Sequence, residues 1–232
     1  MVLLKVNSLT KKYLTKTVLD NLNLTLTEGK IYGLLGPNAS GKTTLLKLIA
    51  GLTQPTAGSF SVNGRQPGVE TKSLVSFLPT INHLPRWMTV SNSLSYYQDF
   101  FPDFKLKIAE ERIDAMGLQP KQKINSLSTG MLGRLKIVLA MSRQAKLYLL
   151  DEPFNGLDPI SREKVLEMIL DSAREDGTIV IATHIIKEIE SIMDEVIFLN
   201  EGQVALMGNV DDLRQTRQMS VEELYKEVYG NA

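Results

Sequence analysis

The segment that most constrains the fold of this chain is a glycine-rich turn between an apolar run and an amphipathic run. Its residues are Gly36, Pro37, Asn38, Ala39, Ser40, Gly41, Lys42 and Thr43. They match the phosphate-binding pattern G-x-x-x-x-G-K-S/T, with a strand-like run at 31–35 before it and a helix-like run at 44–50 after it. A strand, a tight turn and a helix N-terminus form an anion site, because backbone N–H groups and the positive end of the helix dipole converge there. The sequence therefore predicts a nucleoside triphosphate site.

The side chains that follow the second glycine of this pattern have separate expected roles. Lys42 is expected to reach the β- and γ-phosphates, and the Thr43 hydroxyl to be a ligand of Mg²⁺. Thr44, the next residue, is assigned to the same nucleotide site.

Composition excludes several other classes of function. Lys plus Arg equals Asp plus Glu at 26 each, so no net charge attracts nucleic acid or anionic lipid. The absence of cysteine excludes disulfides, thiolate metal sites and thiol catalysis. No apolar run reaches the roughly 18 residues that a membrane span needs, and the first residues lack the build of a signal peptide. We therefore expect a cytoplasmic protein that reaches a membrane only through a partner.

Hydrophobic patterns divide the chain into three parts. The first part contains short predicted strands, at 3–7, 18–26, 31–35, 59–63 and 74–78, with a hairpin expected within the turn-rich residues 55–68. The middle part carries amphipathic helical patterns, at 90–101, 105–116 and 127–143. The last part alternates strands and helices, at 147–150, 161–174, 178–182, 185–192 and 195–199, followed by an edge strand at 203–207 and a helix at 221–228.

This alternation predicts a parallel sheet with right-handed crossovers. The expected fold class is α/β, with a P-loop NTPase core and a mixed, largely parallel sheet. We also expect an N-terminal antiparallel β subdomain and an inserted helical subdomain at about 80–145. The core then comprises about 1–79 and 146–232, within a single domain over 1–232.

The second half of a phosphate site is a carboxylate that holds Mg²⁺ at the end of a neighbouring buried strand. Asp151 follows the strand-like run 147–150 and fits that position. Glu152 comes next and could accept a proton from an attacking water.

In their order, these motifs resemble the ATP-binding cassette of ABC transporters over nearly the whole chain. The most specific piece is Leu150–Pro159, which looks like the Walker B strand running into the D-loop of that family. The resemblance implies ATP as the nucleotide, with Tyr13 stacking on adenine. It also implies that Glu152 is the general base, that His184 contacts the γ-phosphate, and that Lys42 with Mg²⁺ stabilises charge.

A further resemblance lies in residues 127–131, which are similar to the signature segment of the family. There Ser128 and the backbone N–H of Gly130, at a helix N-terminus, would address a γ-phosphate. The resemblance implies that this phosphate belongs to a second cassette, a copy or a paralogue, packed head-to-tail.

Four residues depart from the family pattern. Thr129 and Met131 differ within the signature segment, and Ala39 replaces a frequent glycine, which restricts its φ angle. Thr80 stands where the family places a glutamine that helps to ligate Mg²⁺ and links the site to the membrane subunit. Because threonine is shorter, it would reach a metal only through a water or a loop shift. These differences bear on coupling and rate more than on nucleotide binding.

The implied function is that of an ATP-hydrolysing subunit that energises a separate integral membrane permease from the inner face of the membrane, with export favoured. Two alternatives stay open, a degenerate cassette that regulates a partner with little turnover and a soluble non-transport ATPase of the same class. The aromatic residues Trp87, Tyr96 and Phe100 either pack within the helical subdomain or line a groove for a membrane subunit. No nucleic-acid partner is expected.

Overall fold

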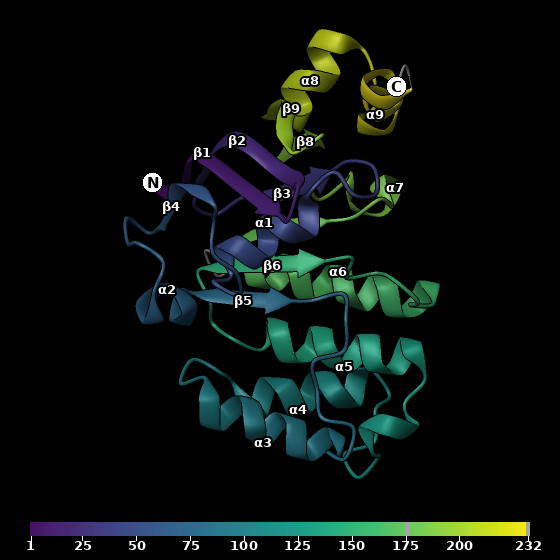
Figure 1. Ribbon diagram of the computed structural model, residues 1–232. Helices are drawn as coiled ribbons and strands as arrows, with labels where there is room; N and C mark the ends of the chain where they lie inside the picture. The colour runs from purple at the N-terminus through teal and green to yellow at the C-terminus, as the bar shows by residue number, and fades with distance from the viewer. Residues whose placement is uncertain (175–176, 231–232) are drawn as a thin grey trace.

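The computed structural model describes residues 1–174 and 177–230, whose strands form two sheets (Figure 1). The smaller sheet is antiparallel with the order β2-β1-β4, from β1 (Val2–Tyr13), β2 (Lys16–Thr27) and β4 (Ala57–Val62). The larger sheet has the order β5-β6-β7-β3-β8-β9. Its strands are β3 (Ile31–Leu35), β5 (Val75–Leu78), β6 (Leu147–Asp151), β7 (Thr178–Ala182), β8 (Glu195–Asn200) and β9 (Gln203–Asn209). Adjacent strands from β5 to β8 are parallel and β9 is antiparallel, which confirms the predicted fold class.

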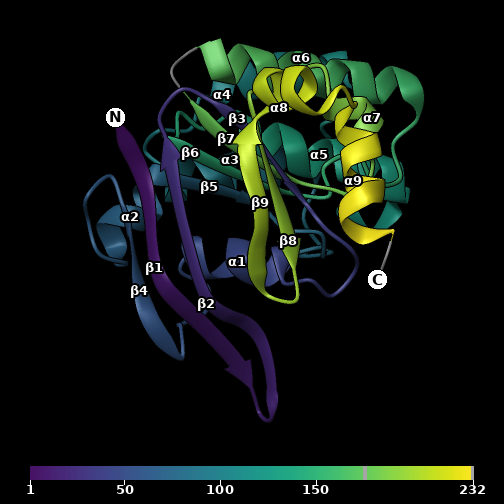
Figure 2. The same cartoon turned by 90° about the horizontal axis from the view of Figure 1, so that it is seen from above.

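The helices lie around the larger sheet. They are α1 (Lys42–Ile49), α2 (Val69–Leu74), α3 (Val90–Phe100), α4 (Leu106–Ala115), α5 (Thr129–Met141), α6 (Pro159–Arg174), α7 (Ile186–Ile189), α8 (Val210–Arg217) and α9 (Val221–Tyr229), with a 3₁₀ turn at Ile124–Ser126. Figure 1 shows α3 and α4 at one end of the molecule and α8 and α9 at the other. Seen from above in Figure 2, the antiparallel strands lie on the opposite side from α7 and α9. Across the described ranges, no helix is long and apolar enough to cross a membrane.

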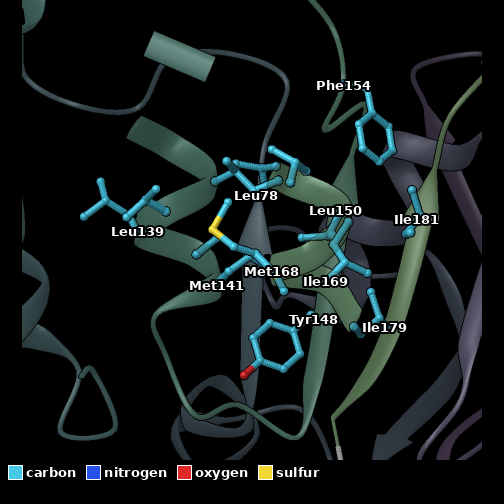
Figure 3. Packing of buried hydrophobic residues seen from close by; sticks show 14 of the residues in the cluster. Leu78, Leu139, Met141, Tyr148, Leu150, Phe154, Met168, Ile169, Ile179 and Ile181 are labelled. Carbon is cyan, nitrogen blue, oxygen red and sulfur yellow. The ribbon is translucent and has the colours of Figure 1, made fainter. Parts of the chain in front are cut away.

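The central strands are hydrophobic throughout because both faces of the sheet are covered. Every residue of β3, β6 and β7 is buried, as is typical of parallel strands between two layers. Figure 3 shows one of these layers, in which side chains of α5 and α6, such as Met141 and Met168, lie beside Leu150 and Ile181 of the strands. Helix α1 and the antiparallel sheet contribute the second hydrophobic cluster, which contains Leu34, Leu45 and Leu149.

Parallel pairing brings the ends of four strands to one edge of the sheet. The phosphate loop follows β3, Thr183 and His184 follow β7, Asp151 and Glu152 lie at the end of β6, and Thr80 comes shortly after β5. Because β7 lies between β3 and β6, the histidine segment is placed between the loop and the acidic pair. Sheets of this kind bind ligands at this edge.

Three local predictions differ from the structure. Strand β1 continues to Tyr13, well beyond the predicted 3–7, because it pairs along its length with β2. The predicted hairpin within 55–68 is reduced to a bridge between Val62 and Arg65, since β4 pairs with β1. Helices α2 and α8 were not predicted. They have six and eight residues and bury only Thr71 and Val210, respectively, so the apolar pattern of each is too short to identify a helix.

Arg143 ties the helical part of the chain to the sheet. Its Nε donates to the Asp103 carboxylate at 3.1 and 3.2 Å, while Nη1 and Nη2 donate to the carbonyls of Val75 (2.7 Å) and Ser73 (2.8 Å). The guanidinium also lies 4.1 Å from the ring centre of Phe101. The Arg143 side chain is 3% exposed and that of Asp103 is 24% exposed, so this ion pair is largely shielded from water.

We expect Arg143→Met to lower the free energy of unfolding by about 3–5 kcal/mol, because it leaves a partly buried carboxylate without its cation. The measurement is urea denaturation followed by circular dichroism. Arg65→Met is the matched control, since its ion pair with Glu70 is exposed (54% and 73%) and is expected to contribute less than about 1 kcal/mol. Equal losses in the two variants would contradict this role of Arg143.

Candidate nucleotide-binding site

Both glycines of the phosphate loop are required by close packing. A Cβ on Gly36 would lie 2.3 Å from the carbonyl oxygen of Leu199. Gly41 has a φ of +110°, and a Cβ there would lie 2.7 Å from Leu19 and 2.9 Å from the carbonyl of Val18. The loop therefore rests on β2 and β8, and its two glycines let the backbone approach them.

Ala39 adopts the left-handed conformation that glycine takes more easily. Its φ is +66°, and this region costs an L-residue about 1–2 kcal/mol. The sequence predicted that alanine restricts the φ angle at this position, and the structure shows Ala39 in a strained conformation.

The loop offers donors that the protein itself does not fully use. The Lys42 ammonium is buried and donates to the carbonyls of Gly36 (2.7 Å) and Pro37 (3.0 Å), both within the loop. Burial lowers the pKa of Lys42, while the nearby carboxylates of Glu152 and Asp151 act in the opposite direction. The buried Ser40 hydroxyl has no hydrogen-bond partner among the described residues, and α1 starts without a side-chain cap. Such an arrangement fits the phosphates of a nucleotide.

A cleft of about 420 Å³ lies in front of the loop. It is lined by Tyr13, Lys16, Val18, Asn38, Ala39, Ser40, Gly41, Lys42, Thr43, Thr44, Thr80, Asp151 and Glu152. The structure thus brings Tyr13, 46% exposed at the end of β1, to the same cleft as the phosphate loop and the acidic pair. Gly36 and Pro37 are not in the lining and contribute through their carbonyls to Lys42.

The predicted metal ligands Thr43 and Asp151 lie in direct contact. The Thr43 hydroxyl donates to Oδ2 (2.9 Å) and Oδ1 (3.1 Å) of Asp151, which is 2% exposed. One carboxylate and one hydroxyl fit Mg²⁺, which is usually bound by one or two carboxylates together with phosphate oxygens and waters. Within the described ranges, no cluster of three or more acidic or histidine side chains offers a complete protein-only metal site.

Thr80 and Lys136 complete the surroundings of Asp151. The Thr80 hydroxyl donates to Oδ2 of Asp151 at 2.7 Å, and the Thr80 carbonyl accepts from Nζ of Lys136 at 2.8 Å. Thr80 therefore contacts the carboxylate that is the predicted metal ligand. Lys136 is buried, which lowers its pKa, although Asp151 counteracts this effect. Sequence reasoning missed Lys136, whose only signal was a charge followed by the hydrophobic run 137–141 of α5.

Glu152 is held by two residues that follow β7. Its carboxylate accepts from the Thr183 hydroxyl at 3.0 Å, and both its oxygens lie 3.0 Å from Nδ1 of His184. The backbone of Glu152 is also unusual, with a φ of +52°. Strained residues of this kind persist where the surrounding structure over-determines them, often at functional sites. Thr183, fully buried, was missed from sequence.

The signature residues Ser128 and Gly130 do not line the cleft that contains Tyr13 and the phosphate loop. Ser128 caps α5, its hydroxyl accepting from the backbone N–H of Met131 at 3.2 Å. A Cβ on Gly130 would lie 2.8 Å from the carbonyl oxygen of Gly156, so this glycine is needed within the chain itself. The structure thus groups Lys42, Thr43, Asp151, Glu152 and His184. Of the signature segment, Thr129 lines a neighbouring cavity with Asp151 and Glu152, whereas Ser128 and Gly130 line neither cavity.

Comparisons with known proteins agree with this geometry. The family model described as ABC transporter matches residues 19–155. The lantibiotic transport ATP-binding protein SrtF of Streptococcus pyogenes is 32% identical over 90% of this chain and 92% of its own. A structure described as the ATP binding subunit of an ABC transporter has a TM-score of 0.87 and 29% identity, covering 97% of this chain and 99% of the other.

A second solved structure is a dimeric ATP-binding cassette in a post-hydrolysis state, bound to ADP and Pi. It has a TM-score of 0.79 and 25% identity, and the match covers 89% of this chain and 98% of that one. With the family model covering more than half of the residues, the assignment of the chain is clear. The chain belongs to the ABC transporter family and is one of its ATP-binding, ATP-hydrolysing cassettes.

Proposed function

We propose that this cassette binds ATP with Mg²⁺ in the 420 Å³ cleft, pairs head-to-tail with a second cassette, and drives outward transport through a separate membrane permease. The observation that carries the proposal is the meeting, in this cleft, of the phosphate loop, the Thr43–Asp151 pair and Glu152. The permease would hold the cassette at the cytoplasmic face of the membrane.

Two parts of the cleft lining would bind different parts of the nucleotide. The exposed ring of Tyr13 stacks on adenine, while the loop N–H groups and the Ser40 hydroxyl bind phosphate oxygens. Lys42 exchanges the carbonyls of Gly36 and Pro37 for the β- and γ-phosphates. Since the ammonium is already desolvated, a charged partner replaces neutral ones at little further cost in hydration.

The hydrolytic step depends on Glu152. Its carboxylate accepts a proton from the water that attacks the γ-phosphate, and Thr183 and His184 orient it for that task. In this proposal His184, whose half-exposed ring contacts Glu152, also contacts the γ-phosphate. Thr43 and Asp151 would hold Mg²⁺, which would offset the negative charge that develops on the phosphate in the transition state.

The second cassette supplies the donors that this cleft lacks. Ser128 and Gly130 lie at the N-terminus of α5 and outside the lining of the cleft. In a head-to-tail pair they address the nucleotide of the partner, so each nucleotide is enclosed by two chains. The similar cassette structure bound to ADP and Pi is dimeric, which supports this pairing.

The exposed aromatic residues that follow the Thr80 loop in the sequence are the proposed contact with the permease. Trp87 and Phe100 are 71% and 64% exposed, and Tyr96 lies with its ring centre 4.5 Å from that of Phe100. Exposed aromatic groups of this kind mark interaction sites. The name of SrtF, a lantibiotic transport protein, supports a cargo of that kind for this chain, and the resemblance to export cassettes supports outward transport.

We expect Glu152→Gln to bind ATP as tightly as the wild type while losing at least about 100-fold in turnover, because an amide cannot accept the proton. ATP binding is measured by isothermal titration calorimetry and turnover by phosphate release. Glu163→Gln, an exposed change on α6, is the control and should retain full activity. Undiminished hydrolysis by Glu152→Gln would refute the assignment of the base.

We expect Thr80→Ala to raise the Mg²⁺ concentration needed for half-maximal ATPase activity by about fivefold or more, because Asp151 loses a charge-assisted hydrogen bond. Thr80→Ser keeps the hydroxyl and should retain the wild-type Mg²⁺ dependence. A Mg²⁺ titration of ATPase rate compares the two variants. The role of Thr80 is wrong if alanine and serine give the same curve as the wild type.

A further inference from the structure

Helix α9 reaches the strand ends from which the phosphate loop starts. The Tyr229 hydroxyl lies 3.0 Å from the carbonyl oxygen of Leu199 and 3.4 Å from that of Leu35. Leu35 is the last residue of β3, and Leu199 belongs to β8, the parallel neighbour of β3. One phenol therefore contacts two adjacent strands at their carboxyl ends.

Both carbonyls lie where β3 becomes the phosphate loop. Leu35 directly precedes Gly36, and the carbonyl oxygen of Leu199 lies where it would meet a Cβ on Gly36 at 2.3 Å. The carbonyl of Gly36 in turn accepts from the ammonium of Lys42 at 2.7 Å. A short series of contacts thus connects Tyr229 with the lysine of the loop.

Helix α9 is held in place by several independent contacts. A capping box of Ser220 and Glu223 starts the helix, and Glu190 accepts from the backbone N–H of Val221 at 2.9 Å. Arg214 of α8 donates to the same Glu190 carboxylate at 3.0 Å. Glu190 is the C-cap of α7, the helix that follows His184, so α9 is also anchored to the histidine segment.

The Tyr229 ring completes an aromatic cluster at this junction. Its centre lies 4.5 Å from that of Tyr225 and 6.0 Å from that of the fully buried Phe198. Burial raises the pKa of Tyr229, so its hydroxyl keeps its proton and acts as a donor. The cluster fixes the direction in which this hydroxyl points.

We propose that Tyr229 is a positioning residue for the phosphate loop, through which the docking of α9 sets the affinity of the cassette for ATP. This inference rests on the proposed function, because it concerns the same nucleotide site. The hydroxyl acts on Gly36 and Lys42 at the start of the loop and is not in contact with Glu152. Its effect therefore falls on nucleotide binding and leaves the proton transfer unchanged.

The test compares Tyr229→Phe with Tyr225→Phe. Both changes remove one hydroxyl from the same helix and the same ring cluster, and the Tyr225 hydroxyl has no hydrogen bond among the described residues. Hydrogen exchange of the peptide that contains residues 36–43 is measured in the nucleotide-free protein. The ATP concentration at half-maximal rate, kcat and the melting temperature are measured on the same variants.

For Tyr229→Phe we expect faster exchange in the loop peptide and a KM for ATP about three- to tenfold higher, the effect of one hydrogen bond. kcat should stay at its wild-type value, and Tyr225→Phe should resemble the wild type in all measurements. The inference is overturned if Tyr229→Phe leaves exchange and KM unchanged, or if Tyr225→Phe changes them equally. A wild-type protein that does not bind ATP would instead refute the proposed function, while the exchange comparison would still decide the role of Tyr229.

Discussion

The hydrogen bond between the Thr43 hydroxyl and the Asp151 carboxylate is the contact on which the whole site depends. It joins the first turn of α1, the helix that follows β3, to the end of β6. Strand β7 lies between β3 and β6 in the sheet. Thr80 adds a second hydroxyl to the same carboxylate, and Lys136 holds the Thr80 loop in reach. A buried anion with two donors is well satisfied. Three segments that are distant in sequence therefore meet at the Asp151 carboxylate.

The site also contains groups that the protein leaves poorly satisfied. Lys42 is buried beside carbonyls of its own loop, and the Ser40 hydroxyl has no partner in the described part of the chain. Ala39 and Glu152 have left-handed backbones that favour glycine. Desolvated donors and strained residues each cost free energy in the isolated protein. A bound polyanion would offset the first of these costs, which favours ligand binding at this edge of the sheet.

Sequence reasoning succeeded where a local pattern carries the information. Strands 31–35 and 178–182 were predicted with the bounds that the structure shows, because parallel core strands are continuous hydrophobic runs. It failed where a residue acts through a distant partner, as Lys136 does with Thr80 across 56 positions and Tyr229 with Leu35 across 194. Such contacts follow from the packing of elements and have no periodic signature. The residue roles in the site stay predictions until variants are measured.

The placement of Tyr13 has a consequence for how a nucleotide affects the molecule. Tyr13 belongs to the smaller, antiparallel sheet, whereas the phosphate loop follows β3 of the larger, mostly parallel sheet. In the proposed binding mode, the base is held by the first sheet and the phosphates by the second. ATP then acts as a non-covalent cross-link between two sheets, and opening either one requires releasing part of the ligand. Pyrophosphate, which lacks the base, would protect only one of them.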